Sequence, residues 1–173
     1  AYEIVFGDGS SDVCSSDLVI VVTGDGAAVN GSTVTISAAG TYLLSGVLHD
    51  GQVLVDADKD AVVRLVLNNL TLQSAESTPL QVLSADKVIL ILADDSENTI
   101  TDARPALTGD GGDIAADDLS DSDEDEETQD NADEINAAIY SKEDLTITGS
   151  GHLTVVTTFR HGINCKEDRK SVV

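Results

Sequence analysis

Short apolar runs alternate with short polar corners along this chain, at intervals of about 25 residues. Within the runs, Val, Ile and Leu recur at every second position, which is typical of a β-strand with one buried face. The corners carry Lys beside Asp or Glu. Four such units occur, at residues 53–67, 80–92, 138–147 and 162–168. A repeat of this length predicts a solenoid, in which each unit buries its apolar face only against stacked neighbours.

Aligning the corners also predicts which strand positions point inward. The inner columns are expected to join Val63, Leu65 and Leu67 with Val88, Leu90 and Leu92, and with Leu145, Ile147 and Gly149. The alternate positions are expected outside, because a register slipped by one residue would bury Arg64. These outer columns join Arg64, Ile89 and Thr146, and then Val66, Ile91 and Thr148.

The composition fits a narrow aliphatic interior. The chain has 173 residues, enough for one domain, with three Tyr, two Phe, no Trp and no Met. A globular sandwich of this size usually centres on aromatic side chains. A solenoid does not need them, because stacked Val, Ile and Leu fill its interior column.

One segment departs from the repeat. Residues 110–134 hold 13 acidic residues and no basic one. Such a segment cannot offset its ordering entropy by burying apolar surface, so we expect a disordered loop inserted into the solenoid. The solenoid itself is then expected over residues 19–168, with about four rungs.

Both ends break the strand rhythm. Residues 6–18 and 168–173 resemble translated adapter sequence of the kind found at the ends of metagenomic fragments. We therefore expect residues 1–18 to be a non-native or disordered leader and residues 169–173 a non-native tail.

Charge and hydropathy exclude several classes of partner. The formal net charge of −23 argues against nucleic acid and anionic membrane surfaces, which repel an acidic protein. The sequence contains no run of 18 apolar residues, the length that a membrane-spanning helix needs. Cys14 and Cys165 are too few for a disulfide framework.

Taken together, several motifs resemble the bacterial family of carbohydrate-binding domain-containing proteins. The likeness runs from about residue 19 to residue 168 and is carried by residues 31–36, 39–46, 50–56, 64–69, 85–88, 97–99, 136–147, 149–155 and 162–168. That family includes cell-surface proteins that bind cellulose and polygalacturonate. The resemblance implies a right-handed single-stranded parallel β-helix akin to that of pectate lyases, with bound calcium and no established catalytic activity. It also implies an extracellular, bacterial cell-surface location. We expect the chain to act as a monomeric part of a larger protein.

Stacked corners would bring carboxylates together. Strands about 4.8 Å apart would place acids above one another, and carboxylates at that spacing repel unless a cation lies between them. Ca²⁺ accepts such oxygen ligands. The candidate metal ligands are Asp58, Asp60, Asp86, Glu143, Asp144, Glu167 and Asp168. Alternatively, these residues make the turns and face water.

Basic residues follow the same corners. The candidate carbohydrate-binding residues are Lys59, Lys87, Lys142, Lys166 and the outward Arg64. Their cations could bind the carboxylates of a uronate chain. The alternative is that the lysines balance the charge of neighbouring acids, in exposed pairs that contribute little.

The leading hypothesis is a non-catalytic, calcium-dependent module that binds acidic plant polysaccharide, such as polygalacturonate or pectin, or cellulose. The scarcity of aromatic rings favours the acidic ligand over stacking on a neutral one. Two alternatives stay open. One is a pectate-lyase-like enzyme with Arg64, Arg104 or Arg160 as base, and the other is a structural surface or adhesin solenoid.

Overall fold

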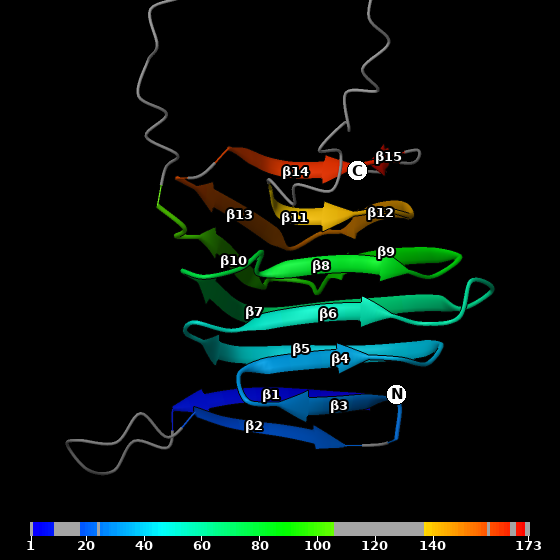
Figure 1. Cartoon of the computed structure of the whole chain (residues 1–173), viewed down its shortest axis with the longest axis horizontal. Helices are drawn as coiled ribbons and strands as arrows, with labels where there is room; N and C mark the ends of the chain where they lie inside the picture. Colours follow the sequence, from blue (N-terminus) through cyan, green and yellow to red (C-terminus); the bar gives the residue numbers. More distant parts are fainter. Residues whose placement is uncertain are drawn as a thin grey trace, which may run out of the picture.

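Every regular element in the described part of the chain is a β-strand. The computed structural model describes residues 2–8, 18–23, 25–105, 137–158, 160–166 and 169–171. Strands from successive repeats lie side by side in two layers (Figure 1). Within those ranges we find no helix of the length and apolar character that crossing a membrane requires. The acidic insertion predicted at 110–134 lies outside the described residues.

Six strands form the first layer, sheet B, in the spatial order β14-β11-β8-β6-β4-β3. All neighbours in it are parallel except the antiparallel pair β3 and β4. The strands are β3 (Ala27–Asn30), β4 (Thr33–Ile36), β6 (Gln52–Asp56), β8 (Leu80–Ser84), β11 (Ala137–Ser141) and β14 (His161–Cys165).

Nine strands form the second layer, sheet A, which branches at its longest strand, β7 (Val62–Ser74). The first half of β7 pairs with β9 and its second half with β10. The other strands are β1 (Tyr2–Asp8), β2 (Leu18–Thr23), β5 (Gly40–Leu48), β9 (Lys87–Leu92), β10 (Glu97–Asp102), β12 (Asp144–Gly149), β13 (His152–Thr157) and β15 (Arg169–Ser171).

The register predicted for the inner and outer columns is confirmed in sheet A. Val88 pairs with both Val63 and Leu145, and Ile89 pairs with Arg64. The first three are fully buried, whereas Arg64 is exposed. Alternation of apolar and polar positions was therefore enough to fix this part of the fold.

The predicted single-stranded parallel β-helix is wrong. The strands form two sheets, and each ends in an antiparallel pair, β1 with β2 and β3 with β4. The β3–β4 pair is a hairpin in which Asn30 faces Thr33 across Gly31, whose φ is +62°. Gly31 and Ser32 are the two central residues of this turn, and Gly at the first of these positions favours the reversal because it tolerates a positive φ.

Part of each predicted terminal segment forms a strand. Tyr2–Asp8 forms β1, which runs parallel to β5 and places Ile4 and Phe6 in the core, so this part of the predicted leader is ordered. Residues 9–17 lie outside the described residues. In the predicted tail, Arg169–Ser171 forms β15 and extends sheet A beside β12.

A pair of stacked tyrosines closes the core near its N-terminal end. The rings of Tyr2 and Tyr42 lie with centroids 4.9 Å apart and planes inclined by 20°. The Tyr42 hydroxyl donates to the carbonyl oxygens of Gly26, at 3.0 Å, and Ala38, at 2.8 Å. Burial, and to a lesser extent Tyr2, raises the pKa of Tyr42.

A buried asparagine links three successive repeats. The Asn98 Oδ1 accepts from the Leu70 backbone N–H at 3.0 Å, and its Nδ2 donates to Ser96 Oγ at 2.9 Å and to the His152 carbonyl at 3.1 Å. This side chain thus satisfies a backbone N–H of β7 and a backbone carbonyl of β13.

Candidate functional site

The predicted basic and acidic residues gather along one edge of the molecule, where each strand of sheet B leads into a strand of sheet A. At β6 to β7 this connection is a turn in which the Ala61 N–H donates to the Asp58 carbonyl at 2.8 Å. Asp58, Lys59 and Asp60 are all exposed on it. Asp86 is exposed at the next connection, where its N–H donates to the Ala61 carbonyl at 2.9 Å.

The acids of this edge do not stack in register as predicted. Asp144 pairs with Lys87, and Lys87 pairs with Val62, so Asp86 and Asp144 occupy different levels of the strand register. The cause is the length of the connections. In each repeat, the connection between the two sheets runs from one paired strand residue to another. It becomes shorter in successive repeats, from Val55–Val62 to Val82–Lys87 and then to Ser141–Asp144.

The lysines stack only in part. Ser141 pairs with Cys165, and Lys142 and Lys166 follow these two residues one repeat apart. Lys87 lies instead at the start of β9, and Lys59 in the exposed turn before β7. The structure thus brings the four lysines to one edge without placing them in a single column.

No metal-binding group is assembled by the residues that the structure describes. Three His, Cys, Asp or Glu side chains that could hold one ion do not occur together in those ranges. Glu143 and Asp144 are half-buried at the edge, while Glu167 and Asp168, predicted beside them, lie outside the described residues. Two of the seven predicted ligands thus lie outside the described residues, and the calcium prediction stays a prediction.

The outer face of sheet A combines cations with an aliphatic strip. Strand alternation places Arg64 and Lys87 on this face, with Arg64 directly beside Ile89. Val66 pairs with Ile91 one step further along the same face. All but the exposed Arg64 are half-buried. We call these five residues, Arg64, Val66, Lys87, Ile89 and Ile91, the cationic face.

Neither cation of this face has a protein partner. The side chains of Arg64 and Lys87 make no hydrogen bond or ion pair with any residue that the structure describes. Asp144 faces Lys87 in the strand register, yet the two charged groups are not paired. Both cations are consequently available to an anionic ligand.

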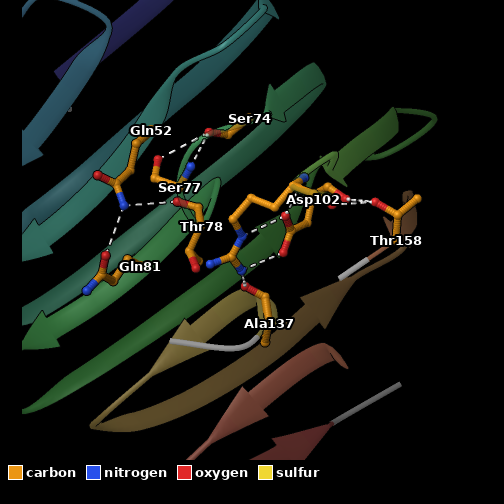
Figure 2. A network of polar contacts seen from close by, with 9 residues as sticks. Gln52, Ser74, Ser77, Thr78, Gln81, Asp102, Ala137 and Thr158 are labelled. Carbon is orange, nitrogen blue, oxygen red and sulfur yellow. Dashed lines mark hydrogen bonds and ion pairs between the residues drawn. The ribbon is translucent and has the colours of Figure 1, made fainter. Parts of the chain in front are cut away.

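An ion pair missed by the sequence analysis lies at the base of the acidic insertion. Arg104 Nε donates to Asp102 Oδ1 at 2.9 Å, and Arg104 Nη2 donates to Asp102 Oδ2 at 2.6 Å. Arg104 Nη2 also reaches the Ala137 carbonyl at 3.4 Å, so it joins the segments on either side of residues 106–136. Thr158 Oγ1 donates to the backbone carbonyl of Asp102 at 3.3 Å (Figure 2). This arrangement gives Arg104 a structural role.

Polar contacts link β6 and β8 of sheet B with the segment that follows β7, and the sequence analysis did not single them out. Gln52 Nε2 donates to the Thr78 carbonyl at 3.0 Å and to Gln81 Oε1 at 2.9 Å, while Ser74 Oγ accepts from the Ser77 N–H at 3.1 Å (Figure 2). The sequence signal that could have indicated these contacts is the presence of a glutamine in each of two apolar strands, Gln52 in β6 and Gln81 in β8. Only the observed register shows that they meet.

Comparison with known proteins gives concordant results. The sequence model of a family described as "Carbohydrate-binding domain-containing protein" matches residues 30–170. A protein of Acetivibrio thermocellus with the same description is 37% identical over 158 residues, which cover 91% of this chain and 49% of the relative. The chain thus spans about half the length of that relative.

A solved structure shares the fold. It is described as that of the polysaccharide lyase-like protein from C. thermocellum, gadolinium derivative, and is 34% identical with a TM-score of 0.74. The similarity covers 99% of this chain and 58% of that chain. Since the family's sequence model spans most of the chain, this protein belongs to the carbohydrate-binding domain-containing protein family.

Proposed function

We propose that this chain is a non-catalytic module that binds an acidic polysaccharide, such as polygalacturonate, through the cationic face. The observation that carries the proposal is the pair of outward cations, Arg64 and Lys87, that no described residue neutralises. Family membership supports a carbohydrate ligand, and the unpaired cations favour an acidic one.

The chemistry of the cationic face suits a uronate chain. A guanidinium binds a carboxylate through two parallel hydrogen bonds, and an ammonium binds it as a point charge. The aliphatic side chains of Val66, Ile89 and Ile91 can pack against the C–H faces of the sugar rings. Because the protein carries a net charge of −23, a polyanion is attracted only locally, and we expect weak, salt-sensitive binding.

Calcium is proposed as a second contribution. Glu143 and Asp144 lie at the edge next to Lys87, and a cation held there could bridge the protein to a carboxylate of the ligand. Bridging would offset the repulsion between two anionic molecules. We propose an extracellular location at a bacterial cell surface, where such polysaccharides occur, and a role as one part of a larger protein.

Two other roles are separable from binding. The solved relative is described as lyase-like, which supports testing for lyase activity on polygalacturonate. A purely structural surface module would bind no polysaccharide at all. Cellulose stays an alternative ligand, although it would leave both cations of the cationic face unused.

The proposal is tested by titrating polygalacturonate oligomers into the wild type and into the variant Arg64→Gln/Lys87→Gln. Arg160→Gln is the matched control, because Arg160 is exposed but lies outside the cationic face. Loss of affinity only in the double variant is expected. Equal affinity in all three proteins would contradict the proposal.

A further inference from the structure

The outer face of sheet A carries few charges on the four strands β5, β7, β9 and β12. Alternation along these strands points Arg64, Lys87 and Asp144 outward, opposite the buried Val88 and Leu145. The other outward side chains of these four strands are uncharged. Arg64 and Lys87 are therefore the two cations that this part of the face offers to a polyanion.

These two cations are diagonal neighbours on adjacent strands. Arg64 pairs with Ile89, which follows Lys87 by two residues on β9. One step between strands and two residues along a strand place the Cα atoms of Arg64 and Lys87 about 8 Å apart. Both side chains are long enough for each to bind a separate carboxylate. The arrangement thus provides for two carboxylates that lie next to each other on the ligand.

The positions on either side of the cations are neutral. Thr41 pairs with Arg64 on the β5 side, and Thr146 pairs with Ile89 on the β12 side. A third carboxylate over either threonine would lose water without meeting a cation, which is unfavourable. A threonine hydroxyl can instead bond to a sugar hydroxyl or to the carbonyl of an ester. These positions therefore favour uncharged sugar residues.

A row of aliphatic side chains extends beyond the cations. Leu43 pairs with Val66, and Val66 pairs with Ile91, so the row crosses β5, β7 and β9. All three side chains are half-buried. The cations occupy only β7 and β9. A chain that lies across the strands along this row would continue over Leu43 with no cation beside it.

Acids surround the two cations on three sides. Asp144 faces Lys87 from β12. Asp60 and Asp86 are exposed at the edge where β7 and β9 begin, and Glu3 is exposed on β1, which pairs with β5. Exposed charges act over about 8 Å at physiological ionic strength. A run of free carboxylates longer than two residues would therefore come within range of these acids and be repelled.

We propose that the preferred ligand of the cationic face is a short block of two adjacent uronates flanked by uncharged residues, as in partly methyl-esterified galacturonan. This inference rests on the proposed binding function and narrows its ligand class. A fully charged polyuronate binds through two of its carboxylates, and its further carboxylates add no affinity.

The test uses galacturonate tetramers with no free carboxylate, two central free carboxylates or four, the others being methyl esters. Calorimetric titration in excess chelator removes any contribution of calcium. For the wild type we expect about a tenfold gain in affinity from none to two free carboxylates. From two to four we expect a gain of at most about threefold, because four carboxylates offer three adjacent pairs. Arg64→Gln/Lys87→Gln should lose the first gain.

The variant Glu3→Gln/Asp144→Asn removes two of the surrounding acids. We expect its ratio of affinities for the tetramers with four and with two free carboxylates to be about two- to fivefold higher than that of the wild type. Asp50→Asn/Glu76→Gln is the matched control. It removes the same charge at two exposed positions outside the cationic face and should keep the wild-type ratio.

The outcomes separate this inference from the proposed function. A gain of tenfold or more from two to four free carboxylates in the wild type, or the same ratio in both double variants, would overturn the preference for a short block. Either result would leave the cationic face standing as a binding site. If the tetramer with two free carboxylates binds the wild type no better than the uncharged tetramer, the proposed function itself is contradicted.

Discussion

Lys87 faces Asp144 on the neighbouring strand of sheet A, yet no ion pair joins the two side chains. The ammonium group is thus held beside a carboxylate that does not neutralise it. A ligand carboxylate would compete with Asp144 for this cation and would be repelled by it. We therefore expect Asp144 to lower the affinity of the cationic face for a polyanion.

Removing the negative charge of Asp144 should strengthen binding of polygalacturonate when calcium is chelated. We expect Asp144→Asn to raise the affinity about two- to fivefold, the range for a partly exposed charge pair. Titration calorimetry in excess chelator measures it. An unchanged or lower affinity would show that Asp144 does not oppose the ligand.

The calcium proposal is tested with the same variant. If Glu143 and Asp144 hold a cation, direct calcium titration should show binding to the wild type that Asp144→Asn weakens at least tenfold, because a charged ligand is lost. Polygalacturonate binding by the wild type should also weaken in chelator. Indistinguishable calcium isotherms for the two proteins would remove this edge as a calcium site.

The buried ion pair of Asp102 and Arg104 should behave as a unit. Arg104→Met leaves the fully buried Asp102 carboxylate without its cation, and we expect a loss of about 3–5 kcal/mol in the free energy of unfolding. Adding Asp102→Asn should restore most of this loss. Urea denaturation of the two single variants and the double variant measures the coupling, and additive losses would argue against it.

Tyr42 makes stability fall at alkaline pH. Its pKa is raised above the ordinary 10.0 in the folded state, so the folded protein holds the phenol proton more tightly than the unfolded chain does. The corresponding stability is present below pH 10.0 and declines as pH rises toward the folded pKa. Wild type should exceed Tyr42→Phe by about 1 kcal/mol at pH 7, and this difference should shrink above pH 10. Denaturation curves at both pH values test the sign.

Lyase activity should be absent. The proposed function is binding, and it assigns Arg64 and Lys87 to holding the carboxylates of the ligand rather than to taking a proton from it. Incubation with polygalacturonate and calcium should give no new absorbance from unsaturated product. A steady rise that Arg64→Gln abolishes would instead establish an enzyme.

Much of sheet A could be predicted from the sequence because the polar residues Arg64 and Thr146 mark the outer positions. Val63, Val88 and Leu145 then align in the one register that keeps Arg64 outside. The alignment of the acidic residues could not be predicted in the same way. It depends on the length of each connection between the sheets, and the sequence does not show where each strand ends and its turn begins. The Gly31-Ser32 turn was a recognisable hairpin signal, but this segment was interpreted as part of a solenoid rung.

The pairing of Gln81 with Tyr140 was hidden for a different reason. Gln81 and Tyr140 are separated by the acidic insertion, and only the pairing of β8 with β11 brings them together. The lack of a partner for the Tyr140 hydroxyl is a property of the packed structure and has no sequence signal.

The most direct test of the account is to locate the ligand. Methyl NMR spectra of the protein, recorded as a galacturonate oligomer is added, report on Val66, Ile89 and Ile91 of the cationic face and on the exposed Val47 and Val156 of β5 and β13. We predict shifts that saturate at the first three residues and are lost in Arg64→Gln/Lys87→Gln. Shifts confined to Val47 and Val156, or none at saturating oligomer, would contradict the assignment of acidic polysaccharide to this face.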